Sequence, residues 1–307
     1  MGRLSAFILG SAAGGGVPQW NCGCEVCRLA WAGDRRVKPR SQAGIAVMAG
    51  RGGDDAAHAP IVLVNASPDL RQQILATPAL QPRGLRMSPI AAVVLTGAEI
   101  DQTAGLLVLR ERGTFALYAT GATLEAVAAN PIFGVLAPDV VTRHAISVGR
   151  KFALPGDLDA ELFLVPGKAP LYLEGAAPAL ATETEANVGI ELAANGARLV
   201  YIPGAARVTP EMAKRIAAAD AVLFDGTLFA DDEMIAAGAG IKTGRRMGHM
   251  PVSGSDGTLK ALAGLARRRI LIHINNTNPI LIEDSPQRRE VEAAGFEVAY
   301  DGMSIEL

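Results

Sequence analysis

Cysteine, histidine and aromatic residues are all scarce in this sequence, and each shortage excludes something. The chain holds only 3 cysteines, all between Cys22 and Cys27, and an odd, crowded set of this kind is not a disulfide framework. Aromatic residues make up only 5% of the chain, so its core must be built from small and branched aliphatic side chains. The 4 histidines leave few nitrogen ligands for a metal ion.

An excess of one charge and long apolar runs are also missing. The 29 basic and 31 acidic residues nearly cancel, and there is no Lys/Arg-rich run, so nucleic acid is not an expected partner. No apolar run approaches the roughly 20 residues of a membrane span. The apolar start, Leu4 to Leu9, is followed by glycines and predicts a first β-strand rather than a signal peptide. We therefore expect a cytoplasmic protein without a membrane span, and its oligomeric state, a homodimer included, is left open.

Hydrophobic periodicity predicts an α/β protein that forms a single domain over residues 1–307. Strands are expected at Leu4–Gly10, Gly44–Ala49, Ile61–Asn65, Ala91–Thr96, Ala116–Ala119, Glu161–Val165, Val188–Leu192, Arg198–Ile202, Ala221–Asp225 and Ile270–Ile274, with two short strands at the end. Helices are expected after Ser67, at about Asp101, at Pro210–Ala219, at Asp256–Arg267 and from about Ser285. The pattern suits two packed sheets covered on both outer faces, and the polar stretch Arg51–His58 is expected to be a surface loop.

The three cysteines form a Cys-x-Cys-x-x-Cys knuckle at about residues 20–28. A turn of this kind brings three thiolates together, and a soft tetrahedral metal such as zinc binds such sulfurs at about 2.3 Å. The fourth ligand must come from elsewhere in the chain, and the histidines are His58, His144, His249 and His273. We assign His249, so that Cys22, Cys24, Cys27 and His249 hold a structural zinc. Three thiolates and a histidine leave no open position for catalysis.

Four stretches of the sequence resemble the PqqB family, the B proteins of pyrroloquinoline quinone (PQQ) biosynthesis. They are Leu9–Cys24 (LGSAAGGGVPQWNCGC), Leu95–Leu107 (LTGAEIDQTAGLL), Arg245–Gly254 (RRMGHMPVSG) and His273–Pro279 (HINNTNP). Because they are spread from one end to the other, the resemblance covers essentially the whole chain. It implies a metallo-β-lactamase-like αβ/βα sandwich, in which two mixed β-sheets face each other and metals bind along one edge.

The resemblance also locates the metal motif of that superfamily, His-x-His-x-Asp-His, on the loop Thr96–Gln102. Asp101 keeps the aspartate position, but Gly97, Glu99 and Gln102 stand where the superfamily has histidines. Glycine offers no ligand and an amide is a poor substitute for imidazole, so a two-zinc hydrolase centre cannot be assembled. Glu99 is either an oxygen ligand or a solvated loop carboxylate, and Asp101 is either a ligand or a helix N-cap.

Later parts of the superfamily pattern are reduced as well. Ile202-Pro203-Gly204 occupies the strand end where a metal-bridging aspartate is expected, whereas His273 matches the terminal histidine of the superfamily. His273 is either a core histidine or a ligand at the edge of a polar pocket with Asn275, Asn276 and Asn278. Asp225 either belongs to that pocket or begins a turn with Gly226. His58 and His144 receive no role.

The family resemblance implies an Fe(II)-dependent oxygenase that hydroxylates the tyrosine ring of a cross-linked Glu-Tyr precursor of PQQ. Asp101 and His273 would be its catalytic metal ligands, completed weakly by Gln102 and Glu99, so the iron would be loosely bound. The alternative is a non-enzymatic carrier that binds PQQ or its peptide-derived precursor and assists its movement toward the periplasm. Hydrolysis by analogy with the fold is the weakest hypothesis, because fold alone does not determine function.

Overall fold

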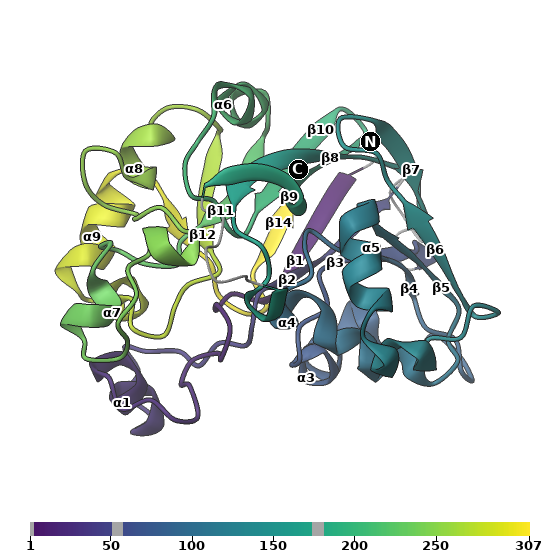
Figure 1. The fold of residues 1–307 in the computed structure, drawn as a ribbon, viewed down its shortest axis with the longest axis horizontal. Helices are drawn as coiled ribbons and strands as arrows, with labels where there is room; N and C mark the ends of the chain where they lie inside the picture. The colour runs from purple at the N-terminus through teal and green to yellow at the C-terminus, as the bar shows by residue number, and fades with distance from the viewer. Residues whose placement is uncertain (1–2, 51–57, 174–180) are drawn as a thin grey trace.

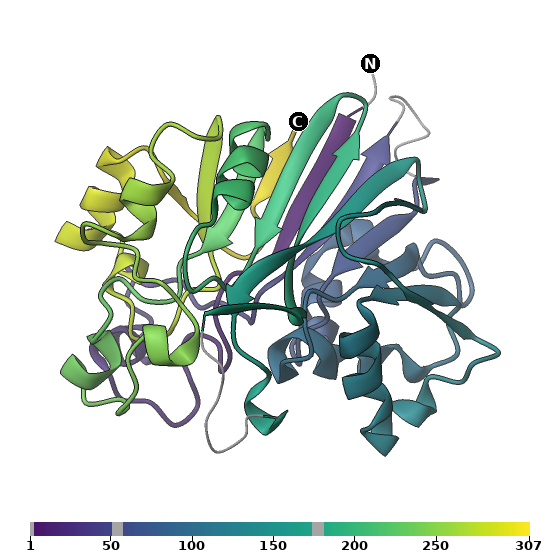
Figure 2. The ribbon, with the colours of Figure 1, turned by 45° about the horizontal axis from the view of Figure 1, so that its top comes forward.

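The structure is a computed structural model and describes residues 3–50, 58–173 and 181–307. Two seven-stranded β-sheets face each other, with helices on their outer sides. Figure 1 shows the strands in the middle of the molecule, α6 to α9 on one side of them and α3 and α5 on the other. In the tilted view of Figure 2, the long strands of the two sheets lie next to one another. The predicted αβ/βα sandwich of two mixed sheets is therefore confirmed.

The first sheet is antiparallel at one side and parallel at the other. Its strands, in order, are β14 (Ser304–Glu306), β1 (Arg3–Gly10), β2 (Gly44–Gly50), β3 (Ile61–Val64), β4 (Ile90–Val94), β5 (Phe115–Ala119) and β6 (Val141–Ala145). Neighbours from β14 to β3 pair antiparallel, and those from β3 to β6 pair parallel. The carboxyl ends of β3 to β6 therefore lie at a common edge.

The second sheet has the same mixed design. Its strands, in order, are β13 (Glu297–Val298), β12 (Arg268–Ile272), β11 (Ala221–Asp225), β10 (Ala197–Ile202), β9 (Thr182–Ala194), β8 (Leu158–Gly167) and β7 (Lys151–Leu154). Neighbours from β10 to β13 pair parallel, so the ends of β11 and β12 also share an edge. Isolated bridges from Gly97 to Asn187 of β9 and from Ala12 to Ile274 join the two halves of the molecule.

The helices are short, and the sequence marks where several begin. They are α1 (Glu25–Trp31), α3 (Leu70–Ala76), α4 (Ile100–Thr103), α5 (Gly121–Ala128), α6 (Pro210–Ala217), α7 (Glu233–Ala236), α8 (Thr258–Ala261) and α9 (Pro286–Ala293). Thr209 and Ser285 accept hydrogen bonds from the backbone in the first turns of α6 and α9, and proline follows each at the first helical position. Of the described helices, none is long and apolar enough to cross a membrane.

Three buried apolar clusters hold the layers together. One lies between the sheets and combines side chains such as Leu4 and Ile45 of the first with Leu162 and Ile190 of the second. The other two lie between each sheet and its helices. Each fully buried aliphatic side chain contributes about 1.5–3 kcal/mol relative to its exposed state. The loops at the sheet edge are thus mounted on a rigid frame.

Several elements differ from the sequence-based expectation. Strands β6 and β7 and helices α1, α5 and α7 were not predicted. In β6 only Val141 is buried, so no apolar alternation marks that strand. Helix α8 is far shorter than the expected 256–267, because Gly257 precedes it and Gly264 has a positive φ of 72°. The expected surface loop lies mostly outside the described residues, and His58 at its end is exposed.

Candidate functional site

Asp101 and His273 meet at the common edge of the two sheets, although 172 positions separate them in sequence. Asp101 lies in α4, which follows β4, and His273 comes directly after β12. The two side chains are mostly buried, and His273 Nε2 lies 2.9 Å from Asp101 Oδ2. His273 has a φ of 58°, a left-handed conformation that costs about 1–3 kcal/mol in a non-glycine residue and turns the chain sharply after the strand. The expectation that these two residues face one another is confirmed.

His249, Asp225 and Thr227 complete this site. Asp225 is the last residue of β11 and is fully buried, and its Oδ2 lies 2.7 Å from His249 Nδ1. The hydroxyl of Thr227 donates to Asp225 Oδ1 at 2.6 Å and lies 2.9 Å from His273 Nδ1. The two imidazole rings stack with centroids 5.3 Å apart. One ligand atom from each of Asp225, His249 and His273 falls within 4.8 Å of the others.

These partners determine which ring nitrogens are available to a ligand. Nδ1–H of His249 donates to Asp225, and because the Thr227 hydroxyl donates to Asp225, its oxygen accepts from Nδ1–H of His273. Each neutral imidazole then carries its lone pair on Nε2. The Nε2 of His273 thus faces a carboxylate oxygen at 2.9 Å, and two acceptors this close require a proton or a metal ion between them. Two ligand atoms bound to one metal at about 2.1 Å also lie about 3 Å apart, so the pair fits a metal ion.

The charges in the site reinforce one another. Burial acts to raise the pKa of Asp101, but the hydrogen bond and the charge of His273 outweigh it and hold that pKa below its ordinary value. Burial acts to lower the pKa of His273, and the hydrogen bond and charge of Asp101 raise it instead. Asp225 also has a lowered pKa, because the charge and hydrogen bond of His249 outweigh the cost of its burial. The Asp101–His273 pair therefore shifts the pKa of each partner toward its charged form, against the effect of burial.

Glu99 and Gln102, which were considered as metal ligands, form contacts at the start of α4. They form a capping box at the start of α4, in which Gln102 Oε1 accepts from the backbone N–H of Glu99 at 3.2 Å. Glu99 Oε1 also pairs with Lys168 Nζ at 3.3 Å. Glu99, not Asp101, is therefore the N-cap of α4, and Asp101 is left to contact His273. The amide oxygen of Gln102 is thus engaged by the helix backbone, and its weak ligand role stays a prediction.

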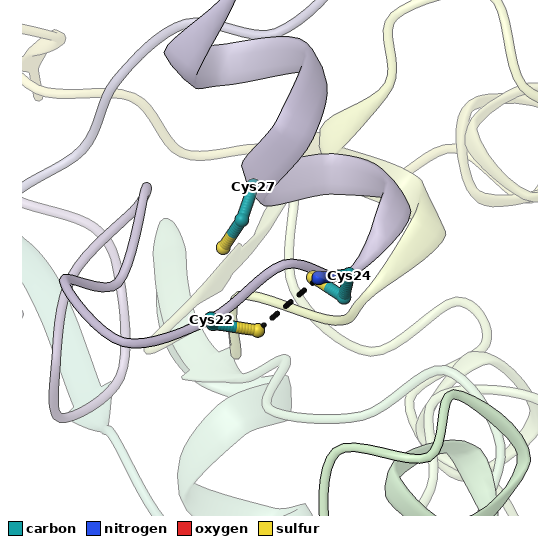
Figure 3. Close-up of side chains that lie close together, drawn as sticks. All are labelled: Cys22, Cys24 and Cys27. Carbon is teal, nitrogen blue, oxygen red and sulfur yellow. Dashed lines mark hydrogen bonds between the residues drawn. The ribbon is translucent and has the colours of Figure 1, made fainter.

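The three cysteines form a second cluster at the start of α1 (Figure 3). Their sulfur atoms lie within 4.8 Å of one another, and no disulfide joins them. Cys22 precedes the helix, Cys24 is its N-cap and Cys27 lies in its first turn. The assignment of His249 as the fourth ligand is wrong, because His249 lies with Asp225 and His273 instead.

Asn276 is the residue that the fold places against the cysteine cluster. Its side-chain nitrogen lies 3.3 Å from Cys27 Sγ and 3.7 Å from Cys24 Sγ, and its backbone oxygen lies 3.3 Å from Cys24 Sγ. Asn276 is 5% exposed and follows His273 by three residues on the same loop. The cysteine cluster therefore contacts the loop that begins at His273.

A cavity of about 430 Å³ opens beside the Asp101–His273 pair. Its lining includes Asp101, Lys168, Asn187, Lys242, His249 and His273. Gly14 also faces it: a Cβ added there would lie 3.9 Å from Asp101 Oδ2, so the glycine keeps the approach to the carboxylate open. A volume of this size suits a small organic molecule. His144, to which no role was given, is exposed and stacks on Tyr118.

Comparison with known proteins agrees with this architecture. A family model described as "Beta-lactamase superfamily domain" matches residues 61–274. The coenzyme PQQ synthesis protein B of Methylobacterium nodulans is 55% identical over 306 residues, covering 99% of this chain and 100% of that protein. The crystal structure of Zn(2+)-bound PqqB from Methylobacterium extorquens has a TM-score of 0.94 at 53% identity and covers 99% and 100% of the two chains. A diphosphatase of the PhnP family, 19% identical, has a TM-score of 0.68 over 100% of this chain and 98% of its own and shares the fold.

Two facing mixed sheets with an Asp–His pair at their common edge define a member of the β-lactamase superfamily. Within that superfamily, the chain belongs to the coenzyme PQQ synthesis protein B family, PqqB, and takes part in PQQ biosynthesis. Sequence reasoning missed Thr227 and the true place of His249. The available signal was the Asp225-Gly-Thr227 segment at the end of a fully buried strand, since His273 also lies at a strand end.

Proposed function

We propose that the protein is an Fe(II)-dependent oxygenase whose iron ligands are Asp101, His249 and His273. The observation that carries this proposal is the pairing of Asp101 Oδ2 with His273 Nε2 at 2.9 Å beside the stacked ring of His249. Two histidines and one carboxylate are the ligand set of non-haem iron oxygenases and leave positions open for O₂ and substrate. His249 thus takes the place first considered for Gln102.

Fe(II) at these residues would hold and activate O₂ next to an aromatic ring. Asp225 and Thr227 orient the two imidazoles through their Nδ1 atoms, which is the usual task of groups behind metal ligands. The substrate would be the tyrosine ring of a cross-linked Glu-Tyr precursor. Conversion of a phenol to an ortho-quinone with one O₂ releases one water, so O₂ alone balances the oxidation.

A structural zinc at Cys22, Cys24 and Cys27 is the second part of the proposal. Three clustered thiols suit zinc, and the solved relative from Methylobacterium extorquens is Zn(2+)-bound. The amide of Asn276 lies where a group closing the site is needed, and its oxygen and nitrogen can be exchanged by a flip of the amide. Zinc here would fix α1 against the loop that begins at His273.

Anaerobic titration with Fe(II) tests the oxygenase proposal. His249→Ala, His273→Ala and Asp101→Ala should each weaken Fe(II) binding by at least about tenfold. His144→Ala is the control, because His144 stacks on Tyr118 at the protein surface. Labelled O₂ should place its oxygen in the product of the precursor. A His249→Ala variant with unchanged Fe(II) affinity and turnover would refute the ligand set.

The carrier alternative is favoured by the loss of superfamily ligands at Gly97 and Gln102 and by the proline at position 203. A carrier would bind PQQ or its precursor equally well in the presence of a chelator, and substitution of Asp101 would not change that affinity. Binding that depends on Fe(II) and on Asp101, together with turnover, would exclude this alternative.

A further inference from the structure

Two lysines line the cavity beside Asp101 and His273, and they differ in what holds their ammonium groups. Lys168 Nζ lies 3.3 Å from Glu99 Oε1 and 3.4 Å from the carbonyl oxygen of Ala169. Its side chain crosses Gly248, where an added Cβ would lie 3.1 Å from Lys168 Cγ. Lys168 therefore braces the end of β8 against α4 and the loop before His249.

Lys242 is half-buried, and among residues 3–50, 58–173 and 181–307 no hydrogen bond or ion pair engages its ammonium group. Its position is nevertheless fixed by the backbone. Gly244, two residues later, donates to the Asp231 carbonyl at 2.8 Å and accepts from the backbone N–H of His249 at 2.9 Å. Lys242 is thus a positive charge held at the wall of the cavity, next to the segment that carries His249.

Other polar side chains of the cavity are committed elsewhere in the protein. The amide nitrogen of Asn187 donates to Val165 and Gly204, that of Asn275 to Thr277, and that of Gln42 to Asp69. Apolar walls are supplied by Ile100, Pro170, Pro203 and Met247. The cavity therefore combines apolar surfaces, which suit a flat ring, with the ammonium group of Lys242, which no described side chain pairs with.

We propose that Lys242 binds a carboxylate of the ligand and so holds an acidic aromatic or quinone ring against Asp101 and His273. The proposal rests on the proposed function in one respect, because it assumes that the substrate enters this cavity. It adds the class of substrate, which is a ring system that bears carboxylates and fits a cavity of about 430 Å³. It also adds Lys242 as the residue that selects this class. Lys242 is a binding and positioning residue, since it lies in the cavity wall and takes no part in holding the metal.

Binding of PQQ itself, measured by equilibrium dialysis in the presence of a chelator, tests the role of Lys242 without iron. Lys242→Met should weaken binding by about tenfold to a hundredfold, as expected for loss of a hydrogen bond to a charged group. Lys242→Arg should restore most of the affinity because it keeps the charge. The matched control is Lys151→Met, since Lys151 is exposed on β7, and it should bind as the unmodified protein does. PQQ with its carboxylates esterified should bind the unmodified protein and Lys242→Met equally.

Two outcomes would overturn this proposal. In the first, Lys242→Met binds PQQ as tightly as Lys151→Met does. In the second, the Lys242→Met substitution weakens binding of the esterified compound as much as it weakens binding of PQQ. Failure of the oxygenase proposal is distinguishable, because it would appear as absent Fe(II)-dependent turnover while the Lys242 effect on binding persists. If turnover is present, Lys242→Met should raise KM far more than it lowers kcat. A fall in kcat with unchanged KM would contradict a role in substrate binding.

Discussion

Replacing Asp225 with asparagine removes the group that orders the imidazoles. The fully buried carboxylate accepts from Ala205 N–H at 2.8 Å and His249 Nδ1 at 2.7 Å on Oδ2, and from Thr227 N–H at 3.0 Å and its hydroxyl at 2.6 Å on Oδ1. An amide keeps one oxygen, which can still accept from Thr227. Its NH₂ group then faces two donors, from Ala205 and His249, and both lose their acceptor.

The magnitude follows from those contacts. Loss of a hydrogen bond to a charged group costs about 1.5–3 kcal/mol, and an unsatisfied buried donor costs about 1–3 kcal/mol. We therefore expect Asp225→Asn to lower the free energy of unfolding by about 3 kcal/mol. Fe(II) affinity should fall by about tenfold to a hundredfold, because His249 is no longer oriented by its Nδ1 partner.

Urea unfolding followed by circular dichroism, with chelator present, measures the first effect, and anaerobic Fe(II) titration measures the second. Asp139→Asn is the matched control: Asp139 forms an exposed ion pair with Arg112 at 2.8 Å, and its loss should change stability by less than about 0.5 kcal/mol. If Asp225→Asn unfolds and binds Fe(II) as the control does, then Asp225 does not orient His249 and the reasoning fails.

Three further predictions concern residues around the two clusters. Gln102→Ala should cost about 1 kcal/mol in urea unfolding by removing the cap contact to Glu99, yet leave Fe(II) affinity unchanged; weaker Fe(II) binding would show that Gln102 is a ligand after all. Cys24→Ser should lose bound zinc in metal analysis and lower Tm by on the order of 5 °C, and retention of both would contradict the zinc site. Burial raises the pKa of Glu233 to about 7, so its native carboxyl holds a proton more strongly than the unfolded one and stability falls as pH rises from the ordinary value toward 7. Glu233→Gln should therefore gain roughly 2–3 kcal/mol over the unmodified protein between about pH 5 and pH 8, and parallel pH profiles of unfolding would contradict this.

The strands that carry the site could be predicted from the sequence because they are marked by continuous apolar runs. Ala221–Asp225 is buried at every position and matches its prediction, and Asp101 and His273 each follow such a strand. Strand β6 has one buried residue and offers no comparable signal. A strand that is buried on both faces can be recognised in the sequence by its continuous apolar run. A strand at the edge of a sheet lacks that burial and so lacks the run.

The fourth partner of the cysteines could not be predicted, because it depends on which loops the parallel strands bring side by side. Histidine is the usual zinc ligand, and that preference favoured His249. The pairing of β11 with β12 instead brings Asp225 and Thr227 next to His273, and His249 joins them through Asp225. Asn276 contacts the thiols three residues after His273, whose positive φ turns the chain, and hydrophobic periodicity does not reveal a positive φ at a single residue.

Gly97 and Gln102, which depart from the superfamily motif separately in sequence, form one structural unit. A Cβ at Gly97 would lie 2.5 Å from Gln102 Oε1 and 3.0 Å from the backbone oxygen of Ala186, so the amide occupies space that a histidine at position 97 would need. The same amide caps α4, and Gly97 forms the bridge to Asn187 that joins the two sheets. Side chains that would bind a metal on this side have thus been exchanged for contacts that hold the helix carrying Asp101. A histidine at position 97 would therefore require the amide of Gln102 to move, and with it the cap contact at the start of α4.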